Sequence, residues 1–232
     1  MNLRTLYLVL HTDRPVKEEG TQLRGYIGRA FPEYPILHHH ADVPIMTYPR
    51  VQYKIIGGTP SLLGIEEGAD VLRSIAADID QFTLLGSRYI VENRVIHEQI
   101  TPFGPVKDPV HYRFHTPWVA LNAKNYGAYR ALGDWKERKE FLNRILVGNI
   151  LSMAKGLGMV VDRRLYVHSR VDEERIRFKG VEMTGFTGEF RVNFAIPEYM
   201  GVGKGTSQGF GTVRALRRES PGSLVAASKK GN

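Results

Sequence analysis

The sequence predicts an α+β fold of two tandem ferredoxin-like domains, the second with a reduced second helix and a glycine-rich loop. Three observations support this prediction. Strand and helix patterns follow the order β-α-β-β-α-β within about the first hundred residues, a Pro- and Gly-rich segment comes next, and further strands then surround one long helix. The predicted units are residues 1–100, a linker at 101–110, a second domain at 111–218 and a disordered tail at 219–232.

The first domain alternates between strand-forming and helix-periodic runs. Between 21 and 31, apolar residues recur at spacings of three and four, which predicts a helix with one buried face that Pro32 ends. The same spacing predicts a second helix over 66–79. Strands are expected at 3–10, 45–56, 61–65 and 81–100. Gly57-Gly58 is the expected hairpin turn between the second and third of them.

The second domain follows a segment that is interrupted by Pro102, Gly104, Pro105 and Pro109. After a strand over 110–121, the strongest helical pattern of the chain runs from about 135 to 157. Asp134 and Glu137 can form its capping box. Three strand-like runs follow at 163–171, 174–185 and 186–197. The glycine-rich run then closes the domain.

The composition excludes several classes of protein. No apolar run approaches the roughly 18 residues that cross a bilayer, so no membrane partner is expected, and the N-terminus lacks a signal-peptide cleavage site. The chain has no cysteine, which excludes disulfides, thiolate zinc sites and thiol catalysis and agrees with a cytoplasmic location. Neither a metal ion nor another cofactor is predicted.

The net charge of +8 is unevenly distributed. Residues 201–232 hold six basic residues and one acid, a net of +5, which leaves +3 for the other 200 residues. A basic end suggests a polyanionic partner such as nucleic acid. A solubilising tail explains the charge equally well.

Five glycines lie among the eleven residues of the segment 201–211. Glycine lets backbone N–H groups approach an anion closely, and the side chains of Lys204, Thr206, Ser207 and Gln208 add donors. An anion-binding loop is therefore favoured over a simple turn before a final strand. The spacing matches neither a Walker A loop nor a dinucleotide-binding fingerprint.

Three consecutive histidines, His38, His39 and His40, follow the first predicted helix. In an extended segment the side chains of His38 and His40 share one side. Two imidazoles with ordinary pKa values near 6.5 suit acid–base chemistry at neutral pH. A zinc site is disfavoured, since there is no cysteine and little nearby acid. On spacing alone, a solvated loop is slightly favoured.

The segment 47–54 alternates Tyr48, Arg50, Gln52 and Lys54 with Pro49, Val51 and Tyr53. One face of such a strand would be cationic and polar. An exposed edge strand is the default interpretation of this alternation.

Together these motifs resemble a known family. The G-Φ-G…GFG form of the glycine-rich run is similar to the signature of the repeat-associated CRISPR proteins, above all the Cas-six-type endoribonucleases that cut CRISPR repeat RNA. The similarity covers nearly the whole chain and includes LRGYIG, PILHHH, YPRVQYKIIGG, GIEEGADVL, TPWVALN and ILVGNILSMAKGLG, in that order. The LH-x-H and YP-x-VQYK elements point to the endoribonuclease branch.

The resemblance implies two RRM-like domains and metal-independent RNA cleavage. In this family the 2′-hydroxyl of the substrate attacks the adjacent phosphate, which leaves 2′,3′-cyclic phosphate and 5′-hydroxyl ends. A histidine in the loop after the first helix acts as base or acid, and the LH-x-H pattern maps onto His38 and His40. A tyrosine and a lysine often assist, for which Tyr48 or Tyr26, and Lys54, are the candidates.

The chemistry of the reaction agrees with these candidates. A base near the 2′-oxygen, an acid near the leaving 5′-oxygen and a cation for the phosphorane charge are needed, and two histidines with Lys54 supply them without metal. Basic strands would hold the RNA backbone through Arg163, Arg164, Arg175 and Arg177. The glycine-rich residues expected to bind RNA are Gly201, Gly203, Lys204, Gly205, Ser207, Gly209, Phe210 and Gly211.

The predicted partner is CRISPR repeat RNA and the crRNA cut from it. Effector-complex subunits and a second copy of the chain are further candidate partners. The alternative function is a non-catalytic RNA-binding subunit of an effector complex, which would need no histidine pair. A generic RRM-type binder is disfavoured, because the aromatic RNP motif does not occur in the chain.

Overall fold

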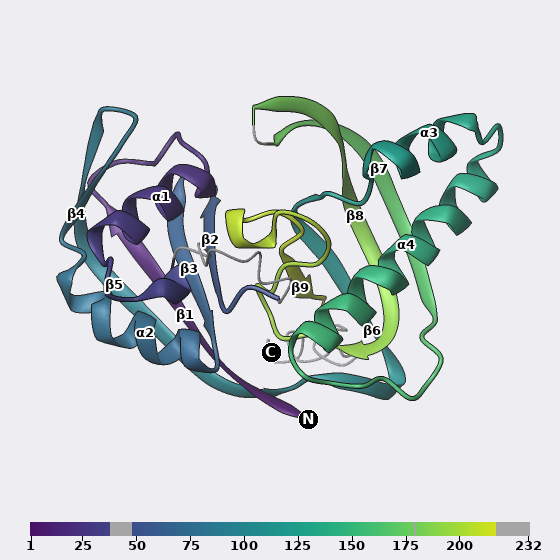
Figure 1. Cartoon of the computed structure of the whole chain (residues 1–232), viewed down its shortest axis with the longest axis horizontal. Helices are drawn as coiled ribbons and strands as arrows, with labels where there is room; N and C mark the ends of the chain where they lie inside the picture. Colours follow the sequence, from purple (N-terminus) through teal and green to yellow (C-terminus); the bar gives the residue numbers. More distant parts are fainter. Residues whose placement is uncertain (38–47, 179, 217–232) are drawn as a thin grey trace, which may run out of the picture.

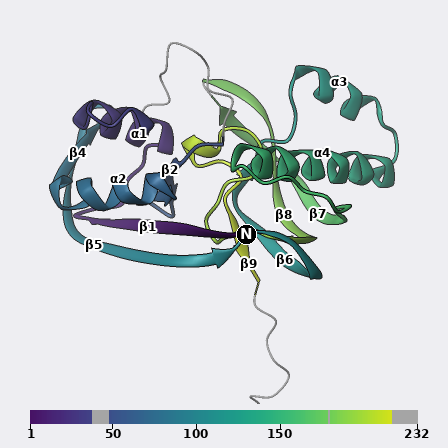
Figure 2. The same ribbon diagram turned by 60° about the horizontal axis from the view of Figure 1, so that its bottom comes forward.

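Two antiparallel sheets lie side by side, and the helices cover the same side of both (Figures 1 and 2). This computed structural model describes residues 1–37, 48–178 and 180–216. The strand order is β2-β3-β1-β5-β4 in the first sheet and β7-β8-β6-β9 in the second. Apart from the edge strand β4, both sheets have the strand order of a ferredoxin-like unit, which confirms the predicted fold class.

The first half of the chain forms the five-stranded sheet and two helices. Leu6, Leu8 and Leu10 of β1 point toward the helices, where they join Leu23 of α1 and Leu72 of α2 in one buried cluster. The elements are β1 (Asn2–Thr12), α1 (Gly20–Ala30), η1 (Pro35–Leu37), β2 (Val51–Ile56), β3 (Thr59–Ile65), α2 (Glu67–Ile75), η2 (Ala76–Asp78), β4 (Gln81–Leu84) and β5 (Ser87–Pro102).

The second half forms the four-stranded sheet, which α4 covers. Between β8 and β9 only a short 3-10 turn remains where a ferredoxin-like unit has its second helix, as the sequence predicts. The elements are β6 (Gly104–Trp118), α3 (Ala123–Ala131), α4 (Trp135–Gly156), β7 (Val167–Phe178), β8 (Val181–Ala195), η3 (Thr206–Gln208) and β9 (Val213–Ala215).

The proposed linker at 101–110 is strand and not loop. It contains the end of β5 and the start of β6, and the two long strands meet at Phe103, which is buried. Proline lacks a ladder donor, and the pairing of β6 with β8 is interrupted between Pro105 and Val110. The prolines therefore mark a break in the pairing rather than a loop between domains.

Two further predictions about elements need correction. The three strand-like runs from 163 to 197 form only two strands, because the middle run spans the turn between β7 and β8, where Gly180 has a φ of +80°. The helix α3 was not predicted. Its predominantly exposed residues form no apolar stripe, and Asn122 caps it by accepting a hydrogen bond from the Asn125 N–H at 2.8 Å.

The two halves share a hydrophobic core. Leu3, Leu63 and Ile65 of the first sheet belong to the same buried cluster as Trp118 and Leu146 of the second half. On the same interface, the rings of Tyr7 and Tyr199 stack with centroids 4.1 Å apart. This packing fixes the two sheets against one another and positions the segments described next.

Candidate nucleic-acid interface

The residues 201–212, here called the glycine loop, lie between the two halves of the protein (Figure 1). The Arg24 guanidinium of α1 donates to Ser207 Oγ at 3.1 Å. A Cβ added to Gly20, at the start of α1, would come within 2.6 Å of the Gln208 carbonyl oxygen. The glycine loop therefore packs directly against the first half.

Two glycines of the loop are required by conformation and by space. Gly203 has a φ of +95°, and a Cβ there would lie 2.6 Å from Trp118 Nε1. Gly209 has a φ of +94°, and a Cβ there would lie 2.7 Å from the Tyr53 carbonyl oxygen. Any other residue would be strained at these positions and would also collide with its neighbours.

Most of the loop's backbone donors are already used inside the protein. The N–H groups of the loop that donate to protein acceptors are those of Gly201, Val202, Lys204, Gln208, Gly209, Phe210, Gly211 and Thr212. A phosphate cradle made of these N–H groups would first need the bonds to break. The exposed cation of the loop is Lys204, so its side chain is the group best placed to meet an anion.

A closed hydrogen-bond network joins the loop to the segment that precedes β2. The Tyr48 hydroxyl donates to the Gly201 carbonyl at 2.6 Å, and the Gly201 N–H donates to Gln52 Oε1 at 2.9 Å. Gln52 Nε2 donates to the Tyr48 hydroxyl at 2.8 Å. Lys54 Nζ donates to the same Gln52 Oε1 at 3.0 Å. We call these four residues the Gln52 network.

Burial changes the acid–base properties of the Gln52 network. The side chain of Lys54 is 0% exposed, and this desolvation lowers its pKa to about 7. Burial also raises the pKa of Tyr48, so its hydroxyl stays protonated. Although β2 is at the edge of its sheet, Gln52 and Lys54 are covered by the second half. The exposed-edge interpretation of this segment is therefore wrong.

The candidate catalytic residues His38 and His40, and His39 between them, lie outside the described residues. Their described flanks are both attached to β2. The Tyr53 hydroxyl donates to the Leu37 carbonyl at 3.2 Å, and Tyr48 belongs to the Gln52 network. β2 therefore anchors the chain on both sides of the histidines, and on one side Tyr48 also bonds to the glycine loop.

The other predicted RNA-binding arginines are on different parts of the second half. Arg163 and Arg164 are exposed on the segment between α4 and β7, where they line a hollow of about 510 Å³ together with Arg144 and Tyr166. Arg177 is near the end of β7 and lines a cleft beside the glycine loop. The predicted basic residues thus form at least two separate surfaces.

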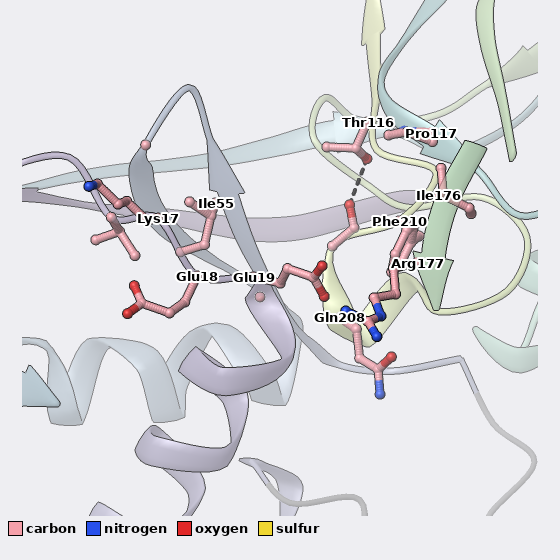
Figure 3. Close-up of a pocket in the computed structure, with 14 residues that line it drawn as sticks. Lys17, Glu18, Glu19, Ile55, Thr116, Pro117, Ile176, Arg177, Gln208 and Phe210 are labelled. Carbon is pink, nitrogen blue, oxygen red and sulfur yellow. Dashed lines mark hydrogen bonds between the residues drawn. The ribbon is translucent and has the colours of Figure 1, made fainter. Parts of the chain in front are cut away.

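The cleft beside the glycine loop, here called the interdomain cleft, has a volume of about 410 Å³. Residues from both halves line it, including Glu19 and Ile55 from the first and Ile176, Arg177 and Phe210 from the second (Figure 3). Sequence reasoning missed Glu19 and Gln52 as site residues. Gln52 belongs to the polar face that the alternation at 47–54 predicts. The position of Glu19 follows only from the packing of the two halves.

Two other kinds of feature are absent from the part of the chain that the structure describes. Among residues 1–37, 48–178 and 180–216, no three His, Asp or Glu side chains gather to form a metal site. No helix within these ranges has the length and apolar character that would allow it to cross a bilayer.

Two ferredoxin-like units with a glycine loop packed between them define a protein of the Cas6 class. The chain matches the Cas6b N-terminal domain over residues 1–101 and the Cas6b C-terminal domain over residues 104–216. A crystal structure of Cas6b is 35% identical to this chain, with a TM-score of 0.83. The match covers 93% of this chain and 100% of that chain. The chain belongs to the Cas6b family, which confirms the resemblance seen in the sequence.

Two further proteins are similar to this chain. The crystal structure of a CRISPR RNA processing endoribonuclease, Cas6b, is 34% identical, with a TM-score of 0.76, and the match covers 93% of this chain and 100% of that chain. An uncharacterized protein of Methanocaldococcus jannaschii is 42% identical over 140 residues, which are 60% of this chain and 95% of that protein.

The Gln52 network gives a direct test of the interface. Tyr48→Phe is expected to lower the free energy of unfolding by about 1–3 kcal/mol, because it removes the hydroxyl that pairs with two buried polar groups. Chemical denaturation measures this change. Tyr126→Phe, on an exposed side chain, is the matched control and should change the stability by less than about 0.5 kcal/mol. Equal effects of the two variants would show that the network contributes no stability.

Proposed function

We propose that this protein is a metal-independent endoribonuclease that cuts CRISPR repeat RNA in precursor transcripts to release crRNA. The observation that carries the proposal is membership of the Cas6b family, matched by both of its domains. The 34% identity to a CRISPR RNA processing endoribonuclease, Cas6b, supports it. Effector-complex subunits and a second copy of the chain stay predicted partners beside the RNA.

The proposed reaction is an internal transfer within the RNA. The 2′-oxygen bonds to the adjacent phosphorus and the bond from phosphorus to the 5′-oxygen breaks, which leaves a 2′,3′-cyclic phosphate and a 5′-hydroxyl. One of His38 and His40 takes the 2′-hydroxyl proton, and the other protonates the leaving 5′-oxygen. In-line attack of this kind needs no third reactant.

In this proposal Tyr48 and Lys54 act as positioning residues. Both are buried and their polar atoms bond within the Gln52 network, so contact with RNA would require the interface to open. Tyr48 directly follows the segment that carries the histidines. Through Gly201, the network fixes Tyr48 relative to the glycine loop.

RNA is held by separate basic groups in the proposal. Lys204 is exposed on the glycine loop, and Arg163 and Arg164 are exposed near the N-terminal end of β7. Contacts of such side chains with phosphate supply affinity that falls as salt rises.

Cleavage of the host's repeat RNA is expected to continue at an unchanged rate in excess EDTA. The motive is the proposed mechanism, in which two imidazoles transfer both protons and no metal-bound water is needed. Single-turnover rates with and without chelator measure this, and end-group analysis of the products checks for the cyclic phosphate. Loss of activity on chelation, with recovery on addition of a divalent ion, would contradict the metal-free mechanism.

A further inference from the structure

Apolar and charged side chains together line the interdomain cleft. Ile55, Ile176 and Phe210 supply apolar surface, and Pro117 adds to it. Its volume of about 410 Å³ lies within the roughly 300–1,000 Å³ of small-molecule sites. Flat aromatic ligands stack well against walls of this kind, and a nucleic acid base is one of them.

Lys17, Glu18, Glu19 and Arg177 are the charged residues that line the cleft, and two of them face each other. Glu19, at the start of α1, and Arg177, from β7, extend toward one another across the space between the halves (Figure 3). Both side chains are exposed to solvent. A ligand between them meets the Glu19 carboxylate, which also caps α1 by accepting from the Gln22 N–H, on one side and a fork of guanidinium donors on the other.

This arrangement matches one base better than the others. Guanine has two donors on its Watson–Crick edge, N1–H and N2–H, and two acceptors on its Hoogsteen edge, O6 and N7. Adenine and cytosine offer only one amino group as a donor on these edges. We propose that the interdomain cleft binds one unpaired guanine of the RNA, with Glu19 on the Watson–Crick edge and Arg177 on the Hoogsteen edge.

A further polar group at the cleft lacks a partner. The Gln208 side chain lines the cleft, and its Oε1 is buried without a hydrogen-bond partner within the part of the chain that the structure describes. Buried acceptors are nearly always satisfied in proteins. Because this oxygen has almost no solvent-accessible surface, a donor of a bound guanosine reaches it only when the Gln208 side chain rotates into the cleft.

This inference rests on the proposed function, because it takes repeat RNA as the source of the guanine. The test replaces each guanosine of the host's repeat RNA, one at a time, with inosine, which lacks only the 2-amino group. Equilibrium binding to the full chain is measured for each RNA. One position is expected to weaken binding by about tenfold, the usual scale for a carboxylate contact to a base edge.

Substitutions in the protein test which side chains cause the loss of affinity for the inosine RNA. In Glu19→Gln the penalty for inosine at the sensitive position should fall below about threefold, because an uncharged amide discriminates less strongly. Glu92→Gln, on an exposed residue of β5, should keep the full penalty. Arg177→Ala should reduce the preference for guanosine, whereas Arg175→Ala, a neighbour on the same strand, should weaken binding of all the RNAs alike.

Several results would overturn the inference. These are equal binding of every inosine RNA, or an unchanged inosine penalty in Glu19→Gln. Micromolar binding of guanosine monophosphate alone would assign the cleft to a free nucleotide instead of RNA. Cleavage is measured separately, so an inactive protein that still prefers guanosine would contradict the proposed function but support this pocket.

Discussion

His38→Ala and His40→Ala are each expected to slow single-turnover cleavage of repeat RNA by about 100-fold or more, while His39→Ala has a much smaller effect. Each of the first two variants removes one of the two proton transfers of the proposed reaction. The milder effect expected for His39 rests on the rule that, in an extended segment, the middle one of three side chains points away from the other two. We expect the larger loss for His40.

RNA affinity and pH dependence complete this test. Binding should change little in the three variants, because neutral imidazoles make few phosphate contacts. The wild-type rate should vary with pH near the ordinary imidazole pKa of about 6.5, since one histidine must be neutral and the other protonated. Normal cleavage by all three variants, or a critical role for His39, would show that this assignment is wrong.

A repeat RNA with a 2′-deoxy group on the nucleotide 5′ to the cleavage site should bind normally and remain uncut. The change removes the proposed nucleophile but leaves the phosphates in place. The dissociation constant should therefore stay within about threefold of that of the natural RNA. Gel assays at saturating protein measure cleavage, and titrations of the same RNA measure affinity.

The control is a 2′-deoxy group at another nucleotide of the same RNA, which should be cut at the normal rate. Cleavage of the RNA that is modified at the cleavage site would mean that water or a protein side chain attacks the phosphorus instead. A loss of binding in that RNA would show that the 2′-hydroxyl is recognised as well as used.

Local patterns predicted much of the fold. The spacing of apolar residues identified α1, α2 and α4, and the glycine pair at 57–58 identified the turn between β2 and β3. The pattern failed at 101–110, where prolines at a break in strand pairing resemble a linker. Proline has no backbone N–H that can donate a hydrogen bond. It therefore occurs both in loops and where the hydrogen bonds between two strands are interrupted.

The site was harder to predict, because its arrangement depends on contacts between distant segments. Gln52 and Gly201 are 149 positions apart, yet they are hydrogen-bonded. The glycine loop was expected to be an open cradle, but its glycines also allow close packing against Trp118 and Tyr53. A glycine pattern alone does not distinguish space for a ligand from space for the protein's own backbone.

The core shared by the two halves has a consequence for how such proteins diverge. Leu63 and Ile65 of the first sheet are buried in the same cluster as Leu146 and Phe194 of the second half. A gene fusion that exchanged one half for that of a distant relative would leave this cluster poorly matched, with cavities or steric overlap. We therefore expect that a substitution on one side of the cluster limits which residues are tolerated on the other side.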